Sequence, residues 1–468
     1  MPKTELGYKH TVHLETVTPV AVGNGGTLSP SADYTLDPQN KQCALLIDHK
    51  MFEAWLAQNP AALTDYLNAV KENNGKNRNT FLYQYLSKYH NKDRTKSYFN
   101  AERTVVGQAD TVELKTCIKD AGSPFIPGST LKGAFKSVWL HNWLDANPVE
   151  IDKIIQSIHS ARDDRETQRK IDETIVECLN DKPNQHKRMQ FSTLQISDAY
   201  CDGDLKWYHT KRFKLLKDDK TVVPLFLEAI APLVEGSFSI LVESNKLVQT
   251  SHRSIKTLEA DSLEPFFAQV NQYALDNIEH ELEMTQSEEL WDYKKFLRDR
   301  KNDIENSQNQ SAWLPIGFGK SNFYQSIGLF IRRRDKGAFE KYIKLFKMGK
   351  KPNAGETDQK ELPLTRNLSI EGHLPLGWIK LYENTHDSSI PKAVEHFNQG
   401  DQIEATVATI VRPFSKVKIP GVDGLINMSG TKNAQRNPRF KEQAVVVVQI
   451  DINKDEKITQ ARFIRVKV

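Results

Sequence analysis

The stretch Phe125–Lys136, with the sequence FIPGSTLKGAFK, has residue types and spacing suited to binding a phosphate group. Gly128 follows a proline and predicts a turn, and Ser129 or Thr130 can cap the helix that starts there. Large apolar side chains then recur at helical spacing, which gives this helix a buried face. The free N–H groups at such a helix start point outward, and together they form a cradle in which a phosphate can sit.

Two lysines and a second glycine in the same stretch bear on that chemistry. Lys132 and Lys136 lie one turn apart and add positive charge beside the cradle. Gly133 is unfavourable inside a helix, so its presence suggests that another backbone comes close to it. The alternative is an ordinary capped surface helix after a turn, and the stretch alone favours neither interpretation.

A second candidate is the segment Lys206–Lys214, in which aromatic and basic side chains alternate. Aromatic rings can stack on bases while cations such as Lys211 and Arg212 meet phosphates, so a β-hairpin here is a candidate for RNA contact. The alternative is an amphipathic strand whose Trp207 and Phe213 enter the core.

A second glycine-rich turn, Trp313–Tyr324, has the sequence WLPIGFGKSNFY and is expected to open a short helix. It lacks the four-residue spacer of a nucleotide-binding P-loop, so an ATP site is not expected. Gly319 and Lys320 instead suit a positively charged turn that approaches a nucleic-acid backbone.

The sequence gives only weak evidence for a catalytic site. Among thirteen histidines, His10 and His13 lie on one strand but are expected to face opposite sides, and no His-x-x-x-His or His-Glu-x-x-His pair occurs. Asp33 is a candidate cleaving carboxylate in a loop, although an aspartate that forms the turn explains it equally well. Four cysteines form no Cys-x-x-Cys pair, so neither a metal site nor a cofactor is expected.

Length and net charge limit the number of domains and the way in which a partner can be bound. Its 468 residues allow two to four domains, and a formal net charge of +4 is only mildly basic. A polyanionic partner must therefore be bound by local patches. The chain has no apolar signal core at its N-terminus and no run of eighteen apolar residues, so we expect a cytoplasmic protein without membrane contact.

Hydrophobic periodicity predicts an α+β fold. Expected strands alternate with helical regions, and two of the helical regions, at about 50–100 and 145–188, are polar enough to be insertions into a larger body. The body is expected to span residues 1–385. From 400 to 468 the pattern changes to five short strands separated by turns, which suits a small closed barrel.

Several motifs, taken in order, resemble the RAMP superfamily of CRISPR RNA-binding proteins. They are Thr18–Gly26 with Asp33-Tyr34, Ile126–Phe135, Leu194–Asp198, Leu227–Pro232, Thr365-Arg366 and Pro375–Leu381. The resemblance covers roughly residues 8 to 383 and is greatest to the fifth Csm subunit of type III-A effector complexes, which caps the filament near the 3′ end of the guide RNA. The length and the closing motif favour this cap over the shorter, repeated backbone subunit.

The resemblance implies ferredoxin-like, RRM-type cores in which glycine loops hold the backbone of the guide RNA. It implies RNA contacts at Gly23, Asn24, Gly25 and Gly26 as well as at the turns described above. It also implies assembly with other type III subunits rather than catalysis, a role in guide RNA maturation through host nucleases, and antiviral target recognition. The plain Gly317-Phe-Gly-Lys turn departs from the Gly-Trp-Gly type of that family.

The C-terminal segment separately resembles an S1-type OB fold, in the order 400–410, 422–429 and 444–452. Such domains bind single-stranded RNA on a strand face, so the resemblance implies contacts with guide or target RNA at Phe414, Lys416, Lys418 and Arg436. Two alternative functions remain at this point. One is a RAMP subunit that cleaves target RNA or an RNA-processing endonuclease, and the other is an S1-containing translation or decay factor.

Overall fold

The structure of the protein is a computed structural model of the 468-residue chain. It describes residues 7–72, 79–107, 113–161, 163–179, 194–216, 224–243, 257–321, 323–348, 361–383, 402–409, 415–418, 426–429, 445–452 and 458–466. The chain divides into two compact units, Met1–Asn384 and Thr385–Val468, which are described separately.

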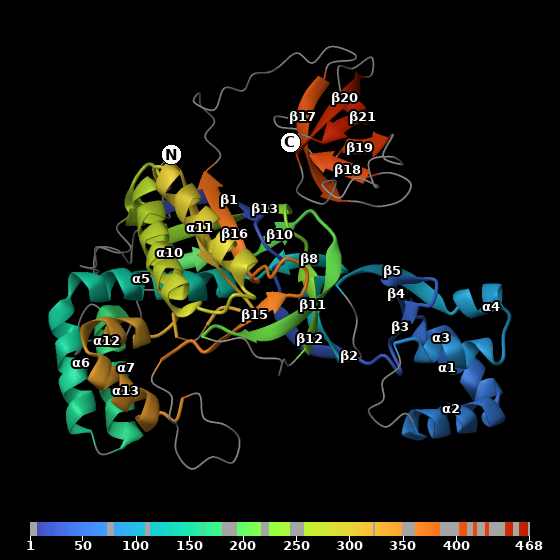
Figure 1. Ribbon diagram of the computed structural model, residues 1–468, viewed down its shortest axis with the longest axis horizontal. Coiled ribbons are helices and arrows are strands. Elements are labelled where there is room, and N and C mark those ends of the chain that lie inside the picture. The colour runs from blue at the N-terminus through green and yellow to red at the C-terminus, as the bar shows by residue number, and fades with distance from the viewer. Residues whose placement is uncertain are drawn as a thin grey trace. The chain divides into compact units, whose positions relative to one another are not determined.

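The first unit is built on an eight-stranded sheet, sheet A, with a ferredoxin-like centre (Figure 1). Four of its strands lie in the order β16-β1-β13-β10, namely β16 (Trp378–Glu383), β1 (Gly7–Thr16), β13 (Glu235–Glu243) and β10 (Ala199–Cys201). In the chain, α5 (Gly128–Ala146) falls between β1 and β10, and α10 (Glu264–Met284) falls between β13 and β16. This is the β-α-β-β-α-β motif, so the predicted α+β fold with a ferredoxin-like core is confirmed.

Both helices pack on the same face of sheet A. Val12 and Phe238 from the strands share one core with Phe135 of α5 and Phe266 of α10. The sheet is extended by β14 (Ser311–Pro315) next to β16, by β8 (Ser123–Ile126) and β7 (Lys119-Asp120) beyond β10, and by β9 (Leu194–Ile196) on β13.

A second eight-stranded sheet, sheet B, has the order β2-β6-β12-β11-β5-β4-β3, with β15 paired to β11. All of its strands lie in chain segments that connect strands of sheet A. Their bounds are β2 (Gly23–Leu28), β3 (Tyr34–Asp37), β4 (Asn40–Ile47), β5 (Phe99–Val106), β6 (Leu114–Cys117), β11 (Leu205–Lys214), β12 (Pro224–Ile230) and β15 (Thr365–Ser369).

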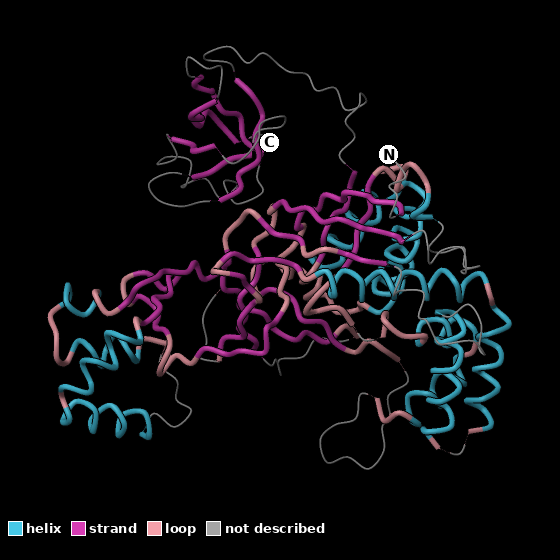
Figure 2. Tube along the Cα trace, turned by 180° about the vertical axis from the view of Figure 1, so that it is seen from behind, coloured by secondary structure: helices cyan, strands magenta, loops and turns pink. Residues whose placement is uncertain are grey.

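Two helical groups lie at opposite ends of the first unit, as Figures 1 and 2 show. One follows β4 and comprises α1 (His49–Gln58), α2 (Pro60–Glu72), α3 (Phe81–Ser87) and α4 (Lys92–Lys96), packed around an aromatic core. The other comprises α6 (Pro148–Ser160), α7 (Asp164–Leu179), α12 (Gly328–Arg334) and α13 (Lys336–Leu345). A further helix, α11 (Trp291–Asn306), follows α10. In the described part of the chain, none of the helices is long and apolar enough to cross a bilayer.

The second unit contains a closed five-stranded barrel in the order β17-β18-β19-β21-β20. Its strands are β17 (Gln402–Thr409), β18 (Ser415–Lys418), β19 (Ile426–Ser429), β20 (Val445–Ile452) and β21 (Ile458–Val466). Val407, Val417 and Val446 are fully buried inside it. The barrel has the strand number of an OB fold, and its assignment as an S1-type domain stays a prediction.

Two local predictions are wrong. The resemblance implies a glycine loop at Gly23–Gly26, but this segment is part of a strand, β2, because its extended backbone pairs with β6 from Gly23 to Leu28, with one irregularity in register. The short helix expected to open from the second glycine turn starts only at Gly328, after Tyr324.

Candidate nucleic-acid interface

The start of helix α5 is packed against a neighbouring connection. The Gly128 N–H donates a 2.7 Å hydrogen bond to Oδ1 of Asp198, and a Cβ atom added at Gly128 would lie 2.1 Å from the Ile196 carbonyl oxygen. A carboxylate from the β9–β10 connection thus satisfies the free N–H that was expected to bind a phosphate, and it also complements the helix dipole. The prediction of a phosphate cradle at Gly128 is therefore wrong.

The predicted helix cap is wrong as well. Pro127 occupies the cap position, and neither Ser129 nor Thr130 provides a side-chain cap. Ser129 is exposed and Thr130 is half-buried. An added Cβ atom at Gly133 would have no neighbour within 4 Å, so the close backbone approach occurs at Gly128 and not at Gly133.

The two lysines of α5 are half-buried. Nζ of Lys132 donates a 2.6 Å hydrogen bond to the Leu194 carbonyl oxygen, and burial, with a smaller contribution from Lys136, lowers the pKa of Lys132. Lys132 therefore ties α5 to β9 within the fold, which leaves it poorly placed to reach a phosphate.

The segment Gly23–Gly26 presents an exposed strand edge, since β2 is the outermost strand of sheet B. Oδ1 of Asn24 accepts hydrogen bonds from the Gly26 N–H at 2.8 Å and from the Thr116 hydroxyl at 2.6 Å. Gly25 has a φ of 84°, in the left-handed region that favours glycine. The glycines let this edge bend while Asn24 holds it against β6.

The second glycine turn packs against the residues that lead into β2. Gly317 and Gly319 have φ values of 63° and 95°, and a Cβ atom at Gly317 would lie 2.5 Å from the Ala21 carbonyl oxygen. The Phe318 N–H donates a 2.8 Å hydrogen bond to that same oxygen. The fold thus brings together two glycine segments that are almost 300 residues apart in the chain.

One exposed cation joins them. Nζ of Lys115, on β6, lies 5.6 Å from the centre of the Phe318 ring. We call β2, Lys115 and Phe318 the glycine edge. It combines a solvent-exposed backbone with a cation and an aromatic ring, which suits it to follow a phosphate backbone. Sequence reasoning missed Lys115 and Phe318, because the pairing that places them is entirely non-local.

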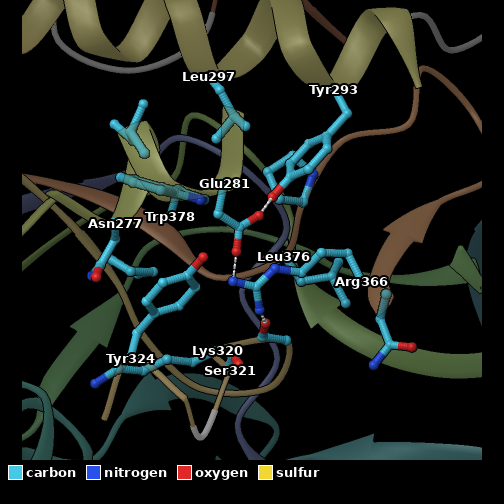
Figure 3. Close-up of a pocket in the computed structure, with 15 residues that line it drawn as sticks. Asn277, Glu281, Tyr293, Leu297, Lys320, Ser321, Tyr324, Arg366, Leu376 and Trp378 are labelled. Carbon is cyan, nitrogen blue, oxygen red and sulfur yellow. Dashed lines mark hydrogen bonds and ion pairs between the residues drawn. The ribbon is translucent and has the colours of Figure 1, made fainter. Parts of the chain in front are cut away.

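A buried ionic network holds the second glycine turn in place (Figure 3). Arg366 donates a 3.2 Å hydrogen bond to the Gly319 carbonyl oxygen and pairs with the Glu281 carboxylate, which also accepts a hydrogen bond from the Tyr293 hydroxyl. Burial lowers the pKa of Arg366 to about 9. Arg366 therefore positions the turn and does not itself face solvent.

Lys320 points into this interior. Its Nζ lies 3.4 Å from the Ser137 hydroxyl and 6.0 Å from the centre of the Tyr273 ring. Burial lowers the pKa of Lys320 to about 8. The adjoining cavity is about 30 Å³, enough for one or two water molecules, so the structure does not present Lys320 to an RNA backbone.

The aromatic and basic strand β11 divides between core and surface. Trp207 is fully buried and Phe213 is 6% exposed, so the core interpretation holds for both rings. Lys211 is half-buried and Arg212 is exposed at the far end of the strand. These two cations can still meet a phosphate, but no exposed ring of β11 accompanies them.

Asp33 closes a turn. Its Oδ2 accepts a 2.6 Å hydrogen bond from the Ser29 N–H, and its Oδ1 lies 3.2 Å from Nε2 of His49. These contacts account for Asp33 as a turn-forming residue. Within the described ranges, no group of three or more His, Cys, Asp and Glu side chains is placed to hold a metal ion.

In the barrel, Lys416 is exposed between the buried residues Ser415 and Val417. Lys418 ends the same strand, β18. Phe414 and Arg436 lie outside the described residues.

Comparison with known proteins gives the family. The RAMP superfamily matches residues 13–324, which is more than half of the chain. The chain belongs to the RAMP superfamily. The matched range of this RAMP protein contains the glycine edge and helix α5, while Arg366 and the barrel follow it.

Individual relatives agree with this family. A curated protein of Methanocaldococcus jannaschii, "CRISPR system Cms protein Csm5", is 24% identical over 288 residues, covering 57% of this chain and 65% of the relative. The chain thus matches slightly less than two thirds of that relative's length.

Solved structures share the fold of this RAMP protein. One is a chain of a Csm–crRNA–target RNA ternary complex of a type III-A CRISPR-Cas system, with a TM-score of 0.56 and 19% identity over 80% of this chain and all of the other. Another is the crystal structure of T. onnurineus Csm5, with a TM-score of 0.54 and 18% identity over 78% of this chain and 99% of the other.

Proposed function

We propose that the chain is a non-catalytic RNA-binding subunit of a type III-A CRISPR ribonucleoprotein. In this role it caps the filament at the 3′ end of the guide RNA and contacts other effector subunits. The observation that carries the proposal is the match in fold to a whole chain of a Csm–crRNA–target RNA complex, together with membership of the RAMP superfamily.

The glycine edge supports guide RNA binding without catalysis. Its exposed backbone and Lys115 can meet phosphates in any sequence, and the glycines at 23, 25 and 26 let the RNA backbone approach closely. Within the first unit, Lys211 and Arg212 of β11 are further phosphate contacts in this proposal, and Lys416 and Lys418 of β18 are phosphate contacts of the barrel by itself. Asp33 is engaged in its turn, so we assign it no part in cleavage.

The barrel of the second unit is proposed as a separate RNA-binding domain that holds the 3′ end of the guide or the target RNA. In the same proposal, the cap supports guide maturation by host nucleases and antiviral recognition of target RNA in the cytoplasm.

Purification of the tagged protein from its own host tests this function. Sequencing of the bound RNA should return short repeat–spacer guide RNAs, and mass spectrometry should identify other Csm-type subunits. Bulk messenger or ribosomal RNA without those subunits would overturn the proposal and would make the barrel the centre of function.

A further inference from the structure

Sheet A has an open face that the glycine edge does not include. Helices α5 and α10 cover the face on which Val12 and Phe238 are buried. On the opposite face, α11 covers the β14 side, where Trp313 packs in one core with Leu297. Beyond that point the side chains of β1, β13 and β10 alternate between buried and solvent-facing, which is typical of an antiparallel sheet with one face in water.

One row of side chains crosses this open face from strand to strand. The strand register places Tyr382 of β16, His13 of β1, Ser237 of β13, Tyr200 of β10 and Phe125 of β8 side by side. Four steps between strands span about 19 Å. The rings form two stacked pairs: Tyr382 with His13 at 5.6 Å and 26°, and Tyr200 with Phe125 at 5.6 Å and 29°.

Packing within the fold does not account for the ring of Tyr200 in the second pair. Tyr200 is 53% exposed, and its hydroxyl lies 3.5 Å from a carboxylate oxygen of Asp120. The other rings of the row are half-buried, so Tyr200 is the ring most open to a partner, and its apolar face gains free energy only when something covers it.

The rows on either side have different chemistry. Thr11 pairs with Ser239 on one side. On the other side Glu15 lies between Glu235 of β13 and Lys380 of β16. Hydroxyl groups can donate to bases and to ribose 2′-OH groups. On the other side two carboxylates outnumber one lysine, whose Nζ lies over the Trp313 ring, so that side repels phosphates. A nucleic-acid strand on this face would therefore carry its phosphates on the hydroxyl side, where Lys9 is exposed one row further on.

We propose that the row of Tyr382, His13, Ser237, Tyr200 and Phe125 stacks the bases of single-stranded RNA. RRM sheets stack two or three bases on aromatic rings of an open face, and this row offers two ring pairs on either side of a serine. The inference rests on the proposed RNA-binding function, and it adds a base-contacting surface to the backbone contacts of the glycine edge.

Fluorescence anisotropy with a fluorescein-labelled single-stranded RNA of mixed sequence tests this proposal on the full chain. Tyr200→Ala should weaken binding between about 5- and 150-fold, the range expected for the loss of one stacked base. Tyr200→Phe should bind like the wild type, because the ring is retained. Val149→Ala, which changes an exposed side chain of α6, is the matched control and should have no effect. The loss should be similar at low and high salt, since stacking releases no counterions.

Three results would overturn the proposal. If Tyr200→Ala bound RNA with wild-type affinity, the row would not be a stacking surface, while the proposed function would still stand. If the wild-type chain did not bind RNA, both the stacking surface and the proposed function would be ruled out. Unchanged RNA affinity combined with loss of a co-purifying effector subunit would make this face a protein interface instead.

Discussion

Replacing Gly128 by alanine is expected to destabilise the first unit, although alanine is the better helix former. The added methyl carbon would lie 2.1 Å from the carbonyl oxygen of Ile196 and 2.9 Å from the carbonyl carbon of Ser197. Because these are backbone atoms, the helix start must move away, at about 1–3 kcal/mol for overpacking. The same movement weakens the hydrogen bond to the Asp198 carboxylate, a loss of about 1.5–3 kcal/mol. The two effects together lower the free energy of unfolding by about 2.5–6 kcal/mol.

Gly133→Ala is the matched control in the same helix. No atom lies within 4 Å of the added Cβ position, so this substitution should raise the free energy of unfolding by about 1 kcal/mol through helix propensity alone. Urea unfolding followed by circular dichroism measures both variants. If Gly128→Ala were as stable as Gly133→Ala, the start of α5 would be open, the packing argument would fail, and a phosphate cradle there would again be possible.

Three further predictions concern single side chains. Lys115→Ala should weaken RNA binding for all sequences and reduce the salt slope by about one, as measured by anisotropy against salt concentration; an unchanged slope would exclude Lys115 from the interface. Asp33→Asn should leave incubated guide and target RNA as intact as the wild type does on denaturing gels, and cleavage by the wild type that this variant lost would restore the endonuclease alternative. Burial lowers the pKa of Lys320 to about 8 in the folded protein, against an ordinary value of 10.5, so between these pH values the unfolded chain binds more protons than the folded protein. The stability of the wild type relative to Lys320→Met should therefore rise as the pH increases from 8 towards 10.5. A difference in urea midpoints that does not change with pH would contradict the burial of Lys320.

The sequence predicted those parts of the fold whose signal is local. The alternating strand that contains Val12 and Leu14, the helix stripe of Phe266 and Val270, and the five short strands of the tail all carry periodicities that can be read within a dozen residues. The structure forms a strand or a helix where each of these periodicities lies, because burial of one face decides the structure of these elements.

The candidate site depended on contacts that no local pattern encodes. Asp198 reaches Gly128 from 70 residues away, and the Phe318–Ala21 hydrogen bond joins segments almost 300 residues apart. A glycine cluster such as Gly23–Gly26 can serve as a loop or as a bent edge strand, and only its partner strand decides between them. Lys320 is of the residue type expected at a surface, but its Nζ lies inward, near the Ser137 hydroxyl and the Tyr273 ring.

Strand β1 is completed by parts of the chain that are synthesised long after it. It pairs with β13 as far as Glu243 and with β16 as far as Glu383. A ribosome that adds about 5–20 residues per second needs about 7–28 s for the 140 residues between those two positions. One edge of β1 has no sheet partner during that interval, and an open edge is a template for aggregation. Versions of the chain that stop before Trp378 would keep that edge open permanently, while removal of residues 385–468 would leave every pairing of sheet A in place.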